Sequence, residues 1–410
     1  MVPKGWSEHT LDDLALVERG KFSVRPRNDP RYYGGDMPFV QTGDVTSSGT
    51  YLKSFSQTLN ENGIGVSKVF PKNTILITIA ANIGDTAITT FEVACPDSVV
   101  AIQPYKHVAD VYWLKKYLET RKTDLDAQST QNAQKNINLQ VLKPLLILTP
   151  PYAEQKKIAK ILSTWDNAIS VTEKLLANSQ QQKKALMQQL LTGQKRLLDE
   201  NGVRFSGDWN SSKLGDLFNF KKGKGLSKSD LSESGINKCI LYGELYTKYA
   251  EIAYEVISRT NSSDGQLSEP GDILLPASTT TSGIDLANAT ALSEGGILLG
   301  GDINILRPKV RLSSPFLAYF LTHMKKNEIS SRAQGITIIH LYGGDLKSID
   351  IVLPSTVQEQ QKIATVLSAA DAEISTLEKK LACLKDEKKA LMQQLLTGKR
   401  RVKVDEAVAV

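Results

Sequence analysis

Polar and basic side chains gather at a few places in each half of the chain, and their types suit hydrogen bonding to nucleic-acid bases. Arg and Lys can bind guanine edges, and Asn and Gln can bind adenine edges. In the first half the candidates are Arg19, Lys21, Arg25, Arg27, Arg31, Tyr32, Gln131, Asn132, Gln134 and Lys135. In the second half they are Lys221, Lys222, Lys224, Ser278, Thr279, Arg332 and Gln334. Phosphate contacts normally outnumber base contacts, and for any one residue a solvated surface position is an equally good explanation.

Catalytic chemistry has no comparable support. Thr149-Pro150-Pro151-Tyr152 resembles the Asn/Asp-Pro-Pro-Tyr motif of amino-methyltransferases, but Thr is a poor substitute for the amide or carboxylate that binds the target amino group. Gly63-Ile64-Gly65 lacks the third glycine of a dinucleotide fingerprint. The four histidines have no metal-ligand spacing. We therefore expect no catalytic residue, no metal site and no cofactor bound by this chain.

Composition predicts a soluble protein with more than one core. The chain has 410 residues, of which 41% are hydrophobic, enough for two domains of ordinary size. Apolar runs are too short to span a membrane, and the N-terminus is unlike a signal peptide, so we expect a cytoplasmic location. The net charge of +6 is concentrated in residues 183–196 and 385–403. Such runs are often solvated helix ends, and the remainder is not basic enough to coat nucleic acid by charge alone.

The elements that must position the candidate residues are repeated. The segment Lys183 to Gly193 recurs letter for letter as Lys388 to Gly398, 205 positions later. A period of half the chain is too long for a solenoid and indicates a duplicated domain with its connector. The result is an internal pseudo-two-fold repeat.

Each copy of the repeat contains one long predicted helix, over residues 154–192 and 359–397. Ser355 and Gln358 match a capping box at the start of the second helix, and Gly193 and Gly398 are placed to end each helix. Steps of three and four residues between seam positions are typical of a coiled coil. The seam includes Ile158, Leu162, Trp165, Ile169, Leu176, Ile363, Leu367, Ile374, Leu377 and Leu381.

Both helices also place a lysine at the same seam position, Lys183 in the first and Lys388 in the second. A charge there costs stability, so it indicates either control of register or a nearby acidic group. Equal helices with matching seams most simply pack antiparallel within one chain; pairing of each helix with a partner protein is the alternative.

The segments before the helices are predicted to be mixed α/β domains. Runs such as Thr74 to Ile79 favour strands, and Val111–Leu118 and Pro315–Leu321 favour short helices. We predict an α+β protein with a first domain at 1–150, a first helix and linker at 151–203, a second domain at 204–353, and a second helix with a basic tail at 354–410. The connectors agree between the copies and the domains have diverged.

These residues resemble the specificity subunit of type I restriction–modification systems. That family repeats a target-recognition domain followed by a Pro-Pro-x-x-Glu-Gln-x-x-Ile helix opening, and Pro150 to Ile158 matches it fully. The second copy, from Pro354 to Ile363, has one proline and one extra residue. Ala333-Gln334-Gly335 is similar to a turn that the family has late in the recognition domain.

The resemblance implies a non-catalytic DNA reader. Each domain would read one half of a gapped, asymmetric duplex target, with the helices as a spacer. The implied partners are double-stranded DNA, two methyltransferase subunits that use S-adenosylmethionine to modify adenine, and two restriction motor-nuclease subunits that use ATP and Mg. A coiled-coil adaptor without DNA readout is one rival class. A freestanding DNA methyltransferase is another, although the chain lacks a recognisable cofactor motif.

Overall fold

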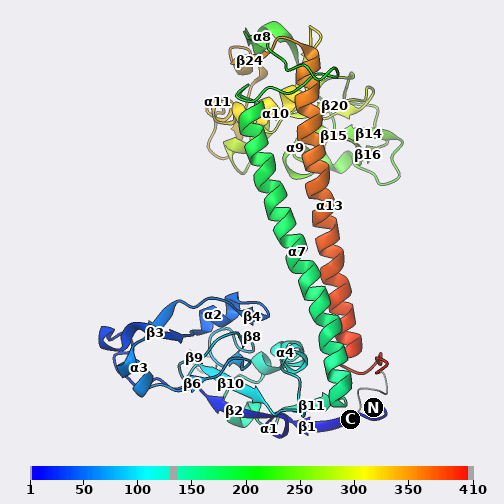
Figure 1. The fold of residues 1–410 in the computed structure, drawn as a ribbon. Helices are drawn as coiled ribbons and strands as arrows, with labels where there is room; N and C mark the ends of the chain where they lie inside the picture. The colour runs from blue at the N-terminus through cyan, green and yellow to red at the C-terminus, as the bar shows by residue number, and fades with distance from the viewer. Residues whose placement is uncertain (1, 130–135, 405–410) are drawn as a thin grey trace. The chain divides into compact units, whose positions relative to one another are not determined.

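The computed structural model describes residues 2–129 and 136–404. It divides into two compact units, one of Met1–Glu173 with Lys379–Val410 and the other of Lys174–Glu378. Each unit contains one mixed α/β domain and one part of each of two long helices, α7 (Tyr152–Leu190) and α13 (Val357–Leu395) (Figure 1).

The domain of the first unit is built on two sheets. A five-stranded sheet has the order β2-β10-β7-β8-β4, formed by Ala15–Arg19, Val99–Pro104, Ile75–Thr78, Thr86–Thr89 and Tyr51–Leu52. A four-stranded sheet has the order β5-β3-β9-β6, formed by Gln57–Leu59, Tyr33–Phe39, Val93–Ala94 and Val69–Phe70. Strands β1 (Ser7–Thr10) and β11 (Leu146–Thr149) form a separate antiparallel ribbon. The short helices are α1 (Leu11–Leu14), η1 (Pro30–Tyr32), α2 (Thr42–Ser47), α3 (Glu61–Gly65), α4 (Val111–Thr120), α5 (Lys122–Ala127) and α6 (Leu139–Leu142).

The domain of the second unit repeats this plan. Its five-stranded sheet has the order β13-β22-β18-β20-β15, formed by Phe218–Lys222, Ile303–Pro308, Ile273–Pro276, Thr290–Leu292 and Ile252–Ala253. Its four-stranded sheet has the order β16-β14-β21-β17, formed by Arg259–Thr260, Asn237–Ile240, Leu298–Leu299 and Gln266–Leu267. Two ribbons complete it, β12 (Trp209–Lys213) with β24 (Asp350–Pro354) and β19 (Ser278–Thr279) with β23 (Ile339–His340). The helices are α8 (Leu214–Leu217), η2 (Lys228–Asp230), α9 (Glu244–Thr247), η3 (Gly283–Ala287), α10 (Ser314–Met324), α11 (Lys326–Ser330) and α12 (Gly343–Leu346).

Corresponding strands agree in direction as well as in order. The edge strand of each five-stranded sheet joins in parallel, β4 to β8 and β15 to β20. The central pair of each four-stranded sheet is also parallel, β3 with β9 and β14 with β21. The repeat inferred from the connectors therefore extends through the two sheets of each domain, and the predicted α+β class is confirmed.

The two long helices pack as an antiparallel coiled coil. In the first unit Lys388 of α13 pairs with Asp166 of α7, and Lys385 lies 2.8 Å from Glu173. In the second unit Lys183 of α7 lies 2.5 Å from Asp371 of α13. Partners advance along α7 while they retreat along α13, which defines the antiparallel direction. The predicted acidic neighbours of both seam lysines are confirmed.

The predicted seam faces inward along both helices. Ile158, Leu162, Ile363 and Leu367 are fully buried, and the remaining predicted seam residues, Trp165, Ile169, Leu176, Ile374, Leu377 and Leu381, are half-buried. Half-burial follows from geometry, because a two-helix pair covers only one side of each seam residue. Where a domain packs on the helices as well, the seam becomes core.

Both helices have 39 residues and lie two residues nearer the N-terminus than predicted. Thr356, rather than Ser355, precedes α13 directly, and its hydroxyl accepts the Glu359 amide at 3.4 Å, which corrects the expected capping box. Gly193 and Gly398 follow the helices with φ of 71° and 69°, a conformation that side chains disfavour and glycine adopts freely. Among the described residues, no helix is long and apolar enough to cross a membrane.

A buried carboxylate lies at the start of each long helix. Glu154 accepts hydrogen bonds from Arg401 at 2.8 Å and from the Trp6 indole at 3.1 Å. Glu359, 205 positions later, accepts from Arg196 at 2.5 and 2.7 Å. The hydrogen bond to Glu359 raises the pKa of Arg196 above its usual value. Each arginine comes from the basic segment that follows the other helix, so part of that charge holds the fold together.

Replacing these arginines by Met should destabilise the two units unequally. Arg196→Met leaves Glu359 buried without its cation and should lower the free energy of unfolding by about 3 kcal/mol. Arg401→Met should cost less, because Arg401 is already 41% exposed against 19% for Arg196, and Trp6 still donates to Glu154. Urea midpoints of the two variants test the order. Equal midpoints would show that burial does not set the strength of these pairs.

Candidate nucleic-acid interface

The candidates from Arg19 to Tyr32, called here the early basic stretch, run from the end of β2 through the connection to β3 and are largely exposed. Its arginines are already held by protein acceptors. Arg27 lies 2.8 Å from Asp97, and Arg31 binds both carboxylate oxygens of Asp29. The hydrogen bonds from Arg31 lower the pKa of Asp29. Since a guanidinium has five N–H donors, each arginine keeps donors free for a ligand.

The other predicted residues of this stretch differ in exposure and in whether their polar groups already have protein partners. Arg19 donates to the Asp97 carbonyl and Arg25 to the Val24 carbonyl at 2.7 Å. Tyr32 is half-buried, with its ring edge against Phe22. Lys21 is exposed, and within the part of the chain that the structure describes its ammonium group has no hydrogen-bond or ion-pair partner.

A hollow of about 420 Å³ opens beside this stretch. Two glutamines that the sequence reading did not select, Gln41 and Gln57, lie on it with their amides 3.0 Å apart. The lining is Phe22, Arg27, Asn28, Tyr33, Phe39, Gln41, Ser56, Gln57 and Pro96. Amide and guanidinium groups that line one hollow with aromatic rings are suited to hydrogen bonding with base edges. The hollow therefore brings together more side chains that can hydrogen-bond to bases than the basic stretch does by itself.

The late polar loop of the first domain falls outside the described residues. Gln131, Asn132, Gln134 and Lys135 are the predicted contacts there, and they stay predictions. The chain returns at Asn136, which is exposed and bridges to Ala80 beyond the end of β7.

In the second unit Lys221 and Lys222 end strand β13 and are exposed, and Lys224 is exposed just beyond. The first two line a hollow of about 240 Å³. Its other lining residues are Phe220, Ala277, Asp302, Asn304, His340, Leu341, Tyr342, Gly343, Gly344 and Lys347. His340 and Tyr342 stack at 6.2 Å with an 18° angle between rings. Three lysines against one carboxylate make this hollow the more cationic of the two.

Two of the predicted DNA contacts, the hydroxyls of Ser278 and Thr279, are buried. Ser278 and Thr279 form β19 and are only 3% and 1% exposed, because they pair with β23 inside the domain. Direct contact with DNA would need that ribbon to open. The next three residues, Thr280, Thr281 and Ser282, also carry hydroxyls and are exposed. These are therefore the better candidates in this conformation.

Arg332 and Gln334 have different environments. The Arg332 guanidinium donates to the Asp345 carbonyl at 2.6 Å and to Ser348. It thereby stabilises the turn after α12. Gln334 pairs with His340 through the backbone, at 2.8 and 2.7 Å, and its side chain is exposed. Of the two, Gln334 is the residue displayed for a ligand.

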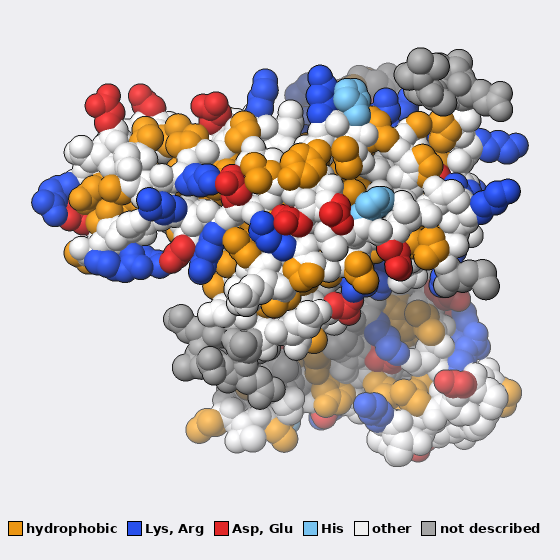
Figure 2. Space-filling view, turned by 90° about the horizontal axis from the view of Figure 1, so that it is seen from below, with side chains coloured by type: hydrophobic (Ala, Val, Ile, Leu, Met, Phe, Trp, Pro, Cys, Tyr) orange, Lys and Arg blue, Asp and Glu red, His pale blue; other side chains and the backbone are white. Residues whose placement is uncertain are grey.

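Charges of both signs are interspersed on one face of the protein. Figure 2 shows Lys and Arg side chains mixed with Asp and Glu on the face that it displays. Across residues 2–129 and 136–404, no group of three or more His, Cys, Asp or Glu side chains is placed to hold a metal ion. The polar hollows thus offer hydrogen bonds and local positive charge, which suit recognition of a polyanion with readable edges.

Comparison with known proteins agrees with this chemistry. The family model described as "Type I restriction modification DNA specificity domain" matches residues 3–178 and again 206–385. The chain belongs to this family. It is similar to the type I restriction enzyme MjaVIII specificity subunit of Methanocaldococcus jannaschii, with 26% identity covering 98% of this chain and 94% of the relative. The MjaIX specificity subunit of the same organism is 23% identical, covering 98% and 95%.

Solved structures of the family share the fold. The S subunit of a type I restriction–modification system from M. genitalium aligns with a TM-score of 0.61 at 18% identity, covering 95% of this chain and 96% of that one. The HsdS subunit of Thermoanaerobacter tengcongensis aligns at 0.50 and 18% identity, covering 97% and 98%. A further chain, from work on complex assembly and conformational transition of the type I R-M system, aligns at 0.52 and 16% identity, covering 97% and 98%.

Neutralising the two β13 lysines should weaken duplex binding for all sequences alike. For each lysine that contacts a phosphate, the slope of log affinity against log salt should become shallower by about 0.9. The double variant Lys221→Gln, Lys222→Gln tests this by binding titrations at several salt concentrations. Lys238→Gln is the matched control, because Lys238 is paired with Glu294 on the same domain. An unchanged slope in the double variant would remove this hollow from the interface.

Proposed function

We propose that this specificity-family chain reads a bipartite, gapped duplex target and performs no chemistry itself. Each domain reads one half-site through its polar hollow and neighbouring loops, and the helix pair sets the unread gap between them. The observation that supports this proposal is that the two domains share one strand order, whereas different residues line their hollows. Two unlike readers on one repeated scaffold suit an asymmetric target in two parts.

The proposed assembly supplies the chemistry from other chains. Two methyltransferase subunits carry S-adenosylmethionine and modify adenine, and two restriction motor-nuclease subunits use ATP and Mg to cleave DNA. This chain directs both by holding the duplex. Its proposed location is the cytoplasm, where such a complex meets DNA.

A methylation map of cells that express this chain with its neighbouring methyltransferase subunit tests the proposal. We expect a split motif with methyladenine on both strands, present with this chain and lost when only this chain is removed. An unchanged map would favour a coiled-coil adaptor without DNA readout. Incorporation of labelled methyl groups by the purified chain alone would instead show a freestanding methyltransferase.

Lengthening both long helices together should lengthen the gap. Inserting seven residues into each keeps the seam in phase and adds about 10.5 Å at 1.5 Å per residue. That length corresponds to about three base pairs of duplex. Methylation mapping should then show the same two half-sites with a longer unread gap. Altered half-sites would contradict the spacer role, and insertion into one helix alone is the matched control that should abolish activity.

A further inference from the structure

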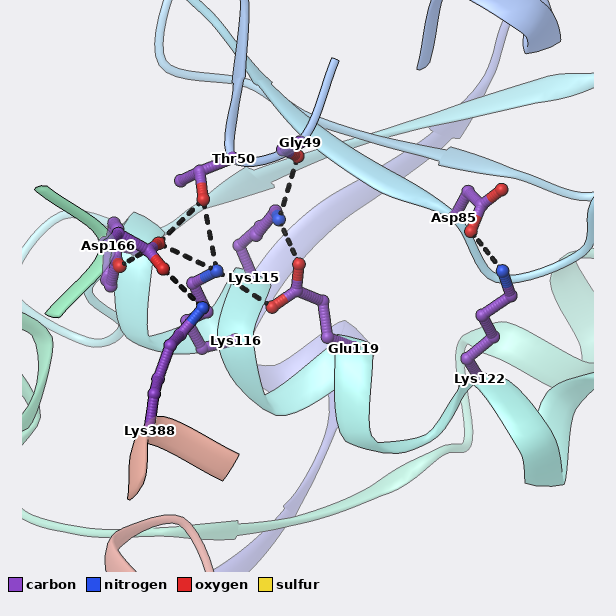
Figure 3. Close-up of polar contacts among 10 residues, drawn as sticks. Gly49, Thr50, Asp85, Lys115, Lys116, Glu119, Lys122, Asp166 and Lys388 are labelled. Carbon is purple, nitrogen blue, oxygen red and sulfur yellow. Dashed lines mark hydrogen bonds and ion pairs between the residues drawn. The ribbon is translucent and has the colours of Figure 1, made fainter. Parts of the chain in front are cut away.

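One carboxylate of α7 contacts both the domain and the second helix in the first unit. Asp166 Oδ2 accepts hydrogen bonds from the Tyr112 hydroxyl at 2.6 Å and the Thr50 hydroxyl at 2.8 Å, and it lies 3.0 Å from Lys116 Nζ. Its Oδ1 pairs with Lys388 of α13 (Figure 3). A single side chain therefore joins three elements: the domain, α7 and α13.

The surrounding charges keep this carboxylate ionised. Burial alone would raise the pKa of Asp166, but the Lys116 ammonium and hydrogen bonds from Lys388 and the hydroxyls outweigh it and hold the pKa well below its usual value. Lys116 is 2% exposed and also lies 3.0 Å from Glu119. Lys115 beside it is fully buried, and burial lowers its pKa to about 8. Such desolvated ion pairs are rigid when every partner is satisfied.

The same arrangement recurs in the second unit, 205 positions along. Asp371 of α13 accepts the Tyr319 hydroxyl on Oδ2 at 2.5 Å and pairs with Lys183 of α7 on Oδ1. The helices have exchanged roles, but one oxygen again contacts the domain and the other contacts the opposite helix. We call these two sites the carboxylate clamps.

The clamps differ in how many groups the domain contributes. In the second unit His323 stands at the position of Lys116, and Glu251 stands at the position of Thr50. These two side chains bind each other. The described domain residues give Asp371 one hydrogen bond, from Tyr319, while Asp166 receives contacts from three domain side chains. His323 stacks on Tyr319 instead. Asp371 thus receives fewer contacts from its domain than Asp166 does.

Each clamp lies farther along its helix than the polar contacts that join the domain to the helix start. At the helix start Gln155 accepts the Asp110 amide at 2.8 Å, and Gln360 accepts the Ser313 amide at 3.0 Å. Asp166 and Asp371 lie 11 residues farther on, about 16 Å at 1.5 Å per residue. The shared apolar core joins each domain to the helices, and directional polar contacts about 16 Å apart along one helix add a restraint on the rotation of the domain.

We infer that Asp166 and Asp371 are positioning residues that fix the rotation of each domain on the helix pair and so restrict the target to one gap length. This inference rests on the proposed function. One added base pair moves a half-site by about 3.4 Å and turns it by about 35°, since a turn holds 10 to 10.5 base pairs. A rigidly clamped domain rejects the turned half-site, and a loosened one accepts it.

Methylation rates on duplexes that differ only in gap length test the clamp. The complex of this chain with its methyltransferase partner is compared on the native gap and on gaps one base pair shorter and longer. In Asp166→Ala the ratio of off-gap to native-gap rate should rise about tenfold, the change expected from losing a hydrogen bond to a charged group. In Asp166→Asn, which keeps an acceptor for Tyr112, the ratio should rise less. Tyr112→Phe, which retains the packed ring, should also raise the ratio.

The matched control is Lys385→Met, which removes the exposed pair with Glu173 on the same two helices. It should leave the ratio within about twofold of the unmodified complex. If Asp166→Ala and Tyr112→Phe lower all rates by one factor with the ratio unchanged, the clamp is structural only and the inference is overturned. If the unmodified complex methylates no gapped target, the proposed function itself fails, which is seen before any variant is compared.

The inequality of the clamps gives a second test in the same assay. Asp371→Ala removes a single domain hydrogen bond and should raise the ratio less than Asp166→Ala. A larger rise in Asp371→Ala would contradict the hydrogen-bond account of positioning.

Discussion

Each domain has its hydrophobic core closed by the helix end of the other repeat. Leu395 and Leu396, at the end of α13, pack into the core of the first domain with the start of α7. Leu190 and Leu191, at the end of α7, pack into the core of the second domain with the start of α13. Neither domain completes its core from one contiguous stretch of chain. Antiparallel pairing of the helices is thus a condition for both domains and for the clamps built on them.

The sequence predicts the long helices and the three elements named inside the domains, β7, α4 and α10, but it does not predict the order of the strands, for physical reasons. A seam with steps of three and four over 39 residues is a long periodic signal, and Gly193 and Gly398 end it by their positive φ. Strands of two to six residues buried on both faces carry no alternation. All of Ile75–Thr78, for example, is buried. The shared strand order of the two domains is invisible for this reason, although the repeated connectors implied it.

Residues that contact DNA are harder still to predict, because whether a side chain is available depends on partners that are distant in sequence. Arg332 is of the residue type that contacts DNA, yet it is half-buried and its guanidinium donates to the Asp345 carbonyl, Ser348 and Glu328. Gln41 and Gln57 look unremarkable 16 positions apart until β3 and β5 pair and bring their amides together. The seam lysines were the opposite case, since a charge inside a coiled coil requires a compensating acid. Predictions succeed where a residue is costly without one specific partner.

The partners of the two seam lysines do not by themselves set the register of the helix pair, and its ends restrict it more strongly. A slip of one heptad would place Lys183 opposite Glu378 and Lys388 opposite Glu173, since each glutamate lies seven residues from the aspartate now used. The two seam lysines therefore keep an acidic partner in the slipped register and the apolar period is also kept, although Asp166 and Asp371 lose their lysines. The same slip moves a helix by about 10.5 Å. That displacement would withdraw Leu190 from its core and separate the helix-start carboxylates from their arginines. Buried ends specify the register, and the clamps act only once it is reached.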